Sequence, residues 1–247
     1  MANLYHLVLY QPLLNLLVIL YQTTAGGDLG VAIIELTVLI QLILFPIVRR
    51  NLRTQMVMQK IQPELRRTQE LYKKDPAKQY QAMMATYREH HISPFGGFAL
   101  TFVQLLLIIP LYQIFLHIFA AETLTQLYSF VSQPAALANI SLGLINLPQP
   151  SILLVVLTAA MQLLQGWLMF QPLAGSGPGP ASSKMMILMG PVITVVIFSR
   201  LPAAVGLYWL ASTIASIGQT VIIRRQLTTS HDQPRSLCSK TDSPDGV

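Results

Sequence analysis

The chain has 247 residues, of which 53% are hydrophobic and only 11% are charged. Soluble domains carry roughly 25% charged residues, so this composition argues against an ordinary soluble enzyme. Sixteen Lys and Arg against ten Asp and Glu give a net charge of +6, which favours an anionic neighbour, either lipid or nucleic acid. The single cysteine, Cys238, excludes a disulfide framework.

Residues 4–22 are apolar, but polar side chains interrupt them. Gln11, Asn15 and Gln22 recur at helical spacing and form a narrow polar stripe. Such a stripe suits a helix that lies in the membrane interface as well as one that crosses the bilayer. Hydropathy alone leaves these two interpretations open.

Five apolar runs follow, and we predict that each is a transmembrane helix. They occupy residues 29–48, 94–121, 151–171, 185–199 and 201–223. A helix needs about 20 apolar residues to cross the hydrocarbon core, and four of the runs meet this length. The run 185–199 covers only roughly 22 Å as a helix, so it would thin the bilayer or let its flanking cations reach the interface.

The positions of the cations predict the topology. Fifteen of the sixteen Lys and Arg lie in 49–93, 172–184 and 224–247, whereas Arg200 is the single cation on the other side. By the positive-inside rule these three segments are cytoplasmic, and the loop 122–150 and the N-terminus face outward. Because the cations flank the apolar runs, we expect contact with anionic lipid and no direct contact with nucleic acid.

The cytoplasmic segment 49–93 carries two apolar stripes at helical spacing, with the sequence KKDPAK between them. Asp75 can cap a helix and Pro76 suits its first turn, so we predict a helical hairpin with a basic outer face. By composition we expect a flexible loop over 172–184 and a disordered tail over 224–247.

No nucleotide-binding or metal-binding motif occurs in the chain. The spans contain only Glu35 and His117 as ionisable candidates, too few for a catalytic set. We therefore expect no cofactor, no metal and no enzymatic activity.

Polar residues inside the spans are the candidate functional residues, because such residues are costly in lipid and face a protein interior or water. They recur three or four residues apart, so that each group shares one helix face. The candidate set comprises Thr37, Gln41, Thr101, Gln104, Gln165, Ser212, Ser216 and Gln219. Two interpretations stay open: the four polar faces enclose a hydrated groove, or they form ordinary hydrogen bonds between helices.

In order along the chain, several segments resemble the YidC/Oxa/Alb membrane insertase family. The resemblance covers about residues 10–227, and its most specific parts are SPFGGF at 93–98 and the segment 188–227. It implies an all-α integral membrane fold with five transmembrane helices, an amphipathic helix over 1–28 on the outer surface and a cytoplasmic helical hairpin. No large extracytoplasmic domain is expected, so the resemblance is to a core-only bacterial form in the plasma (inner) membrane.

The resemblance implies an insertase that moves hydrophobic helices and short polar segments of nascent membrane proteins through a hydrophilic groove, without nucleotide hydrolysis. Gln41 stands where the family usually has an arginine, so the positive charge thought to attract acidic client segments is absent. Whether a Sec-type translocon or the ribosome assists is left open. The alternative is a small channel or carrier that uses the same polar faces.

Overall fold

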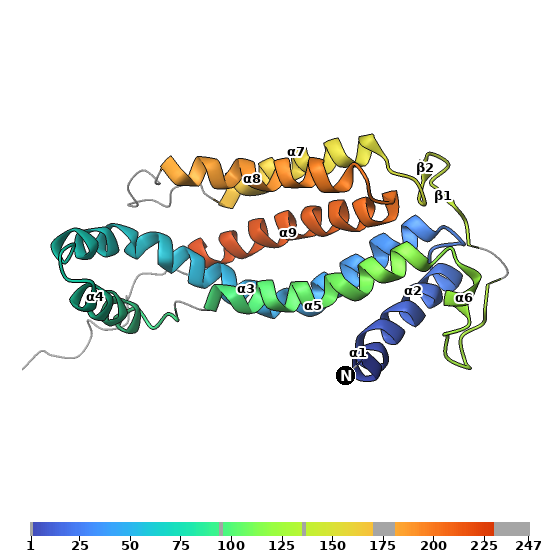
Figure 1. The fold of residues 1–247 in the computed structure, drawn as a ribbon, viewed down its shortest axis with the longest axis horizontal. Helices are drawn as coiled ribbons and strands as arrows, with labels where there is room; N and C mark the ends of the chain where they lie inside the picture. Colours follow the sequence, from blue (N-terminus) through green and yellow to red (C-terminus); the bar gives the residue numbers. More distant parts are fainter. Residues whose placement is uncertain (1, 94–95, 135–136, 170–180, 230–247) are drawn as a thin grey trace, which may run out of the picture.

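The computed structural model describes residues 2–93, 96–134, 137–169 and 181–229, and these residues are almost entirely helical (Figure 1). The helices and strands are α1 (Ala2–Tyr5), the π-helical η1 (His6–Tyr10), α2 (Gln11–Thr23), α3 (Leu29–Leu71), α4 (Pro76–Glu89), α5 (Gly96–His117), α6 (Ala121–Leu124), β1 (Ile140–Ser141), β2 (Ile145–Asn146), α7 (Ile152–Met169), α8 (Ala181–Phe198) and α9 (Ala203–Thr229).

Helix α3 begins at an N-cap, where the carboxylate of Asp28 accepts hydrogen bonds from the backbone N–H groups of Gly30 and Val31. The helix runs for 43 residues, about 65 Å at 1.5 Å per residue, roughly twice the thickness of a hydrocarbon core. One continuous helix therefore joins the predicted span at 29–48 to the first arm of the predicted hairpin, with no break at residue 49. Apolar and basic stretches both favour helix, so polarity changes at this point without ending the helix.

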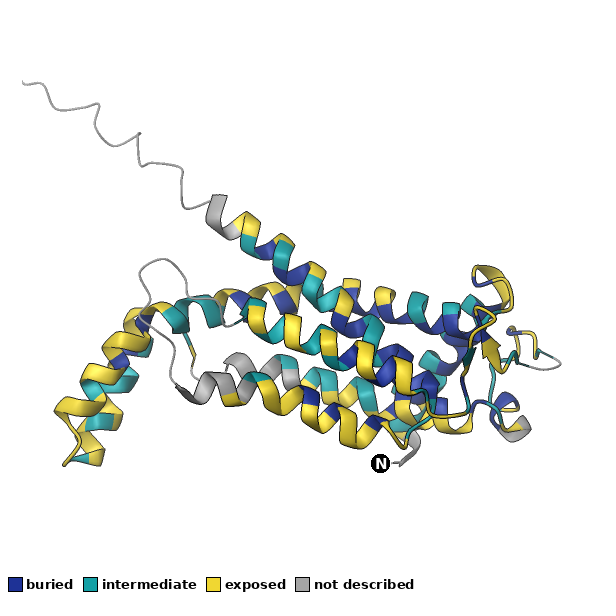
Figure 2. Ribbon diagram, turned by 90° about the horizontal axis from the view of Figure 1, so that it is seen from above, coloured by how far each residue is buried: buried dark blue, intermediate teal, exposed yellow. Residues whose placement is uncertain are grey.

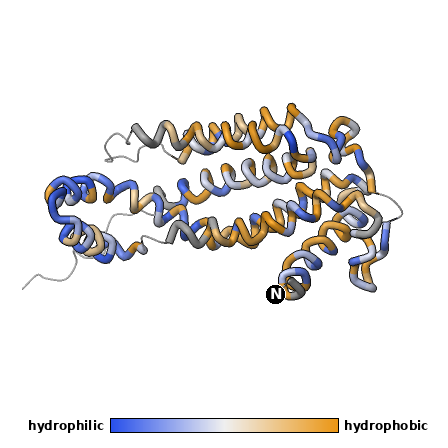
Figure 3. Tube along the Cα trace, in the orientation of Figure 1, coloured by the Kyte–Doolittle hydropathy of each residue, from blue (hydrophilic) through white to orange (hydrophobic). Residues whose placement is uncertain are grey.

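The distal part of α3 turns back into α4 (Figure 1). Asp75 caps α4 by accepting a hydrogen bond from Lys78 N at 3.1 Å, and Pro76 occupies the first turn. Ile61, Leu65 and Thr86 are buried where the two helices meet, whereas the Lys and Arg of the pair are largely exposed. This end of the molecule is the hydrophilic one in Figure 3.

The remaining long helices form an elongated bundle. Helix α9 packs against both α3 and α7, α8 packs against α7, and α5 packs against α3. In the described part of the chain, α3, α7 and residues 203–226 of α9 are long and apolar enough to cross a membrane, and Phe102–His117 and Ile187–Phe198 are shorter apolar helices. Large apolar side chains are exposed along these helices, as they would be against lipid (Figures 2 and 3).

Two of the predicted boundaries near the C-terminal end need correction. Helix α8 starts at Ala181 and has 18 residues, so it is about 27 Å long. It is therefore longer than the roughly 22 Å predicted from the apolar run 185–199. Helix α9 continues to Thr229, so the predicted disordered tail does not begin at 224. In both cases polar residues extend a helix that hydropathy ends at the last apolar position. Residues 170–180, which cover the end of the predicted span 151–171 and most of the predicted loop 172–184, lie outside the described residues, as do residues 230–247.

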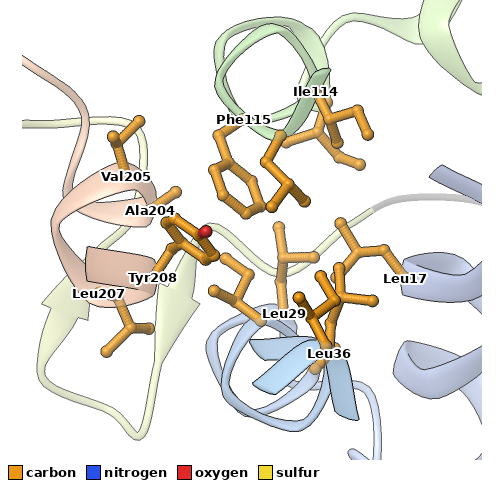
Figure 4. Close-up of a cluster of buried hydrophobic side chains, with 14 of the residues drawn as sticks. Leu17, Leu29, Leu36, Ile114, Phe115, Ala204, Val205, Leu207 and Tyr208 are labelled. Atoms are coloured by element: carbon orange, nitrogen blue, oxygen red, sulfur yellow. The ribbon is translucent and has the colours of Figure 1, made fainter. Parts of the chain in front are cut away.

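The buried core is concentrated at the end of the bundle opposite the α3–α4 pair. Leu29, Ile33 and Leu36 of α3, together with Ile114 and Phe115 of α5, are at most 1% exposed. They meet Ala204, Leu207 and Tyr208 of α9, as Figure 4 shows. This packing joins α3, α5 and α9 at one end.

The polar stripe of α2 contacts the segment that follows α6. Asn15 is 2% exposed, and its side chain accepts a hydrogen bond from Tyr128 N at 2.8 Å. Gln11 and Gln22 donate to the carbonyls of Gln126 and Ser132, at 3.2 and 2.6 Å. These bonds tie the stripe that the sequence left ambiguous to protein, although Gln11 Oε1 is buried without a hydrogen-bond partner in the described part of the chain. The predicted outer loop 122–150 supplies these partners and also contains the β1–β2 hairpin.

Candidate functional site

Three of the candidate residues form one connected hydrogen-bonded set between α3 and α9. Gln41 Nε2 donates to Ser212 Oγ at 2.8 Å, and Gln219 Nε2 donates to the backbone carbonyl of Gln41 at 2.7 Å. Gln41, Ser212 and Gln219 are 8%, 7% and 8% exposed. The sequence left open whether these polar residues line a hydrated groove or form hydrogen bonds between helices. In the structure, Gln41, Ser212 and Gln219 form direct hydrogen bonds between α3 and α9.

Gln219 leaves one polar atom unsatisfied in this set. Its Oε1 is buried and has no hydrogen-bond partner in the described part of the chain. The amide orientation is determined by the carbonyl that Nε2 faces. An acceptor buried in this way costs about 1–3 kcal/mol unless a donor reaches it.

A second pair of hydrogen bonds joins α7 to its neighbours. Gln165 Nε2 donates to Ser216 Oγ of α9 at 2.8 Å. One turn earlier, Gln162 Oε1 accepts a hydrogen bond from Thr194 Oγ1 of α8 at 2.8 Å. Thr194 is 3% exposed and was not among the candidates, because a single Thr in an apolar run has no periodic signal.

Two other candidates, Thr37 and Gln104, are not brought into these contacts within the described residues. Thr37 is buried, but its hydroxyl donates to the carbonyl of Ile33 in its own helix at 2.6 Å. Gln104 is half-buried on α5. Thr101 belongs to α5, but its side chain lies outside the described residues.

A cavity of about 490 Å³ lies among α5, α7, α8 and α9. Leu105 and Tyr112 contribute from α5, Ile193 and Ile197 from α8, and Trp209 from α9. Gln162 and Thr194, which bond to each other, contribute polar side chains to the lining. Tyr208 lines the cavity, and Ser212 lies one turn further along α9, so the polar set begins next to the cavity on the side of the α3–α4 pair.

The last described turn of α7 accepts hydrogen bonds from two other helices, and the sequence did not predict these contacts. Gln59 Nε2 of α3 and Arg224 of α9 both donate to the carbonyl of Met169, at 2.9 and 3.1 Å. Donors at a helix C-terminus satisfy its free carbonyls and oppose its dipole. Three helices far apart in sequence are thereby tied together where the apolar bundle meets the basic α3–α4 pair.

The described residues contain no group of three His, Cys, Asp or Glu that could hold a metal ion. Glu35 lies near the start of α3, where its carboxylate accepts a hydrogen bond from Thr24 at 2.5 Å. His117 bonds through Nδ1 to the carbonyl of Gln113 at 2.8 Å. These two ionisable groups are both engaged locally and are not brought together into one site.

The fold and its buried Gln, Ser and Thr contacts define a multi-pass α-helical membrane protein. Residues 11–230 match the sequence profile of a family described as 60Kd inner membrane protein. The membrane protein insertase YidC of Clostridium tetani is 31% identical over 203 residues, which cover 82% of this chain and 84% of that protein.

The membrane protein insertase YidC of Pelobacter propionicus is 30% identical over 221 residues, 88% of this chain but only 39% of that longer protein. A crystal structure described as an active YidC insertase, with its first transmembrane domain resolved, superposes with a TM-score of 0.59 at 23% identity. The match covers 88% of this chain and 46% of that one, and it shows the shared fold. The chain belongs to the YidC/Oxa/Alb family and is an inner-membrane, multi-pass protein.

Proposed function

We propose that this chain is a membrane protein insertase. It moves hydrophobic helices and their short polar segments from the cytoplasm into the bilayer, without nucleotide hydrolysis. The observation that carries the proposal is the adjacency of an apolar cavity to a buried polar set that contains an unsatisfied acceptor. Named relatives support the same role, since the similar proteins from C. tetani and P. propionicus are both called insertases.

The polar set gives a client's polar segment an alternative to lipid. An unpaired backbone polar group costs several kcal/mol in hydrocarbon. Gln41, Ser212 and Gln219 bond to one another in the resting bundle, and they exchange these bonds for bonds to the passing segment. Gln219 Oε1 needs no exchange, because it is already an open acceptor.

The cavity gives the client's apolar helix a surface to follow. Its lining is largely aliphatic and aromatic, and it lies where α5 and α8 do not pack extensively against each other. Transfer of the client into lipid is then favoured by roughly 25 cal/mol per Å² of apolar surface removed from water. No covalent step is needed.

In this proposal α5 and α8 cross the bilayer together with α3, α7 and α9, so the bundle has five spans. The N-terminus lies outside, and the α3–α4 pair and the C-terminus are cytoplasmic. The exposed cations of the α3–α4 pair rest on anionic headgroups, at about 1 kcal/mol each near the surface. Helices α1 and α2 lie along the outer interface.

Reconstitution into liposomes with a single-span test protein and no nucleotide tests this function. We expect insertion well above that in protein-free liposomes, scored by protease protection of the translocated tail. Photo-crosslinkers at Leu105 and Ile193, which line the cavity, should capture the client. Matched crosslinkers at Leu42 and Ile43, exposed on α3, should not.

Three results would contradict the proposal. The first is insertion no greater than in protein-free liposomes, and the second is insertion that requires added nucleotide. The third is ion flux without insertion, which would instead support the channel or carrier interpretation.

A further inference from the structure

The β1–β2 hairpin carries three exposed apolar side chains that the bundle does not use. Ile140, Leu142 and Leu144 are 57%, 59% and 88% exposed, and we call them the apolar tip. Cross-strand neighbours pair Ser141 with Ile145, and Ser141 is fully buried. Ser141 and Ile145 face the bundle, where Ile145 packs against the core. Ile140, Leu142 and Leu144 are exposed, next to the polar Asn146. Three large apolar side chains exposed together on one hairpin form a patch of the kind that marks an interaction site.

The hairpin is held rigidly to the bundle from both sides. Asp28, the N-cap of α3, accepts hydrogen bonds from Ser141 Oγ at 2.6 Å and from Leu142 N at 2.7 Å. After the hairpin, Leu147 and Gln149 accept from the backbone N–H groups of Ala204 and Ala203, at 3.1 and 2.9 Å. The apolar tip is thus presented in one orientation by contacts to α3 and α9.

The turn holds a bulky residue in a conformation that favours glycine. Leu144 N donates to Ser141 O at 3.0 Å and closes a turn whose central residues, Leu142 and Gly143, have φ of +52° and +68°. Glycine, asparagine or aspartate is usual at such positions. Leu142 therefore adopts a costly backbone conformation, and its side chain is exposed instead of packing within the described part of the chain.

The surroundings of the apolar tip point to lipid as its partner. The sequence contains no Asp, Glu, Lys, Arg or His between Glu122 and Lys184, so no charge within this segment keeps it in bulk water. The hairpin lies at the end of the bundle where α7 begins (Figure 1). There, Ile152 and Leu153 are 79% and 63% exposed on a membrane-spanning candidate, which continues the apolar surface toward the tip.

We propose that the apolar tip inserts into the lipid leaflet that borders this end of the bundle and anchors the hairpin there. Leucine and isoleucine side chains gain from leaving water, and the rigid hairpin loses little further conformational freedom when they do so. Through Asp28, the anchored hairpin would fix the height of α3 in the membrane.

Nitroxide labels on single cysteines in nanodiscs test the proposal, in a background that carries Cys238→Ser. The test sites are Leu144→Cys and Ile140→Cys, whose exposure makes the substitutions tolerable. Val156→Cys, exposed on α7, calibrates lipid, and Lys73→Cys, exposed at the turn between α3 and α4, calibrates water. The measured quantity is the collision rate of each label with oxygen, which partitions into lipid, and with a water-soluble nickel chelate.

We expect the oxygen-to-nickel ratio at positions 144 and 140 to exceed the ratio at Lys73 several-fold and to approach that at Val156. A ratio equal to that at Lys73 would place the tip in water and overturn the proposal. A label that is immobilised and shielded from both reagents would overturn it as well, because the tip would then be covered by protein, such as a second copy of this chain.

Discussion

At the scale of single residues, Asp28 joins two parts of the chain that are 113 residues apart. Its carboxylate accepts four hydrogen bonds, two from the first turn of α3 and two from the β1–β2 hairpin. Burial by itself would raise the pKa of Asp28, but the hydrogen bonds from Leu142, Ser141, Val31 and Gly30 outweigh it and lower the pKa below its usual range. The ionised form is therefore the one that the folded protein stabilises.

This lowered pKa predicts a pH dependence of stability. A carboxyl with a lower pKa in the folded state stabilises the fold above its unfolded pKa, about 3.9, and the contribution is lost as pH falls through the folded value. Thermal unfolding in detergent should show Asp28→Asn less stable than the parent at pH 7 by about 1–3 kcal/mol. The difference should shrink as the pH falls below about 4; a difference that is constant with pH would contradict this account.

Gly30 lets the hairpin approach α3 closely. A Cβ at this position would collide with both side-chain heavy atoms of Ser141 and touch Leu207. We expect Gly30→Ala to destabilise the protein by about 1–3 kcal/mol, as overpacking does, measured as a lower melting temperature. Gly218→Ala in α9 is the matched control: nothing lies within 4 Å of its added Cβ, and alanine favours helix by up to about 1 kcal/mol.

Gln41 is an uncharged amide in the buried polar set between α3 and α9, and Gln41→Arg tests what a cation at this position would do. A guanidinium there has Ser212 Oγ as an acceptor, and Gln219 of the same set carries an open acceptor, Oε1. We expect the variant to fold without the roughly 2.5–3.5 kcal/mol cost of a cation at the centre of a lipid-facing helix. It should also increase insertion of clients with acidic tails relative to neutral ones.

The control for this prediction is Gln41→Leu, which removes the donor to Ser212 without adding charge. It should cost about 1 kcal/mol and leave the preference for acidic tails unchanged. If Gln41→Arg unfolds while Gln41→Leu folds, the position is dry and packed, and the polar set is not a path for clients.

At the scale of elements, helix α3 belongs to the bundle in its first part and pairs with α4 in its last part. Helices α3 and α4 pack against each other, and Ile61 and Leu65 of α3 and Thr86 of α4 are buried. Glu64 and His90 approach to 3.5 Å across the pair. Gln59 donates a hydrogen bond from this region to the carbonyl of Met169 in α7. The last part of α3 and α4 therefore pack mainly against each other, and Gln59 links this pair to the bundle.

Two deletions test whether the end of α3 and α4 fold separately from the bundle. Replacing 62–85 by a short Gly-Ser linker should leave the melting temperature of the bundle nearly unchanged in detergent. The larger deletion 55–85 also removes Gln59 and its bond to the carbonyl of Met169, and it should lower stability by about 1 kcal/mol more. Loss of folding in the smaller deletion would show that the pair packs as part of the core.

At the scale of the whole molecule, polarity is distributed along the bundle axis. Most of the Lys and Arg lie in the α3–α4 pair at one end, whereas the segment between α6 and α7 at the other end carries no charged residue. This arrangement predicts sidedness. In intact spheroplasts without Cys238, an impermeant thiol reagent should label Gln133→Cys directly and Lys73→Cys only after lysis. The opposite result would reverse the topology.

The sequence by itself determined that this is a helical membrane protein, and it located most helices. Hydropathy, helical periodicity and caps such as Asp75 act over a few neighbouring residues, so the sequence displays them directly. Family membership was also readable from segments such as SPFGGF, since the profile matches residues 11–230. Local signals failed where polarity changes inside a continuous helix, as in α3.

Only the tertiary structure decided which polar groups meet. Gln41 and Ser212 are 171 residues apart, Asp28 and Ser141 are 113 apart, and Gln59 lies 110 residues before Met169. A Gln in an apolar run has the same pattern whether it faces water or another helix. Its partner depends on how α3, α7 and α9 pack, and that packing is set by shape and burial summed over the whole bundle.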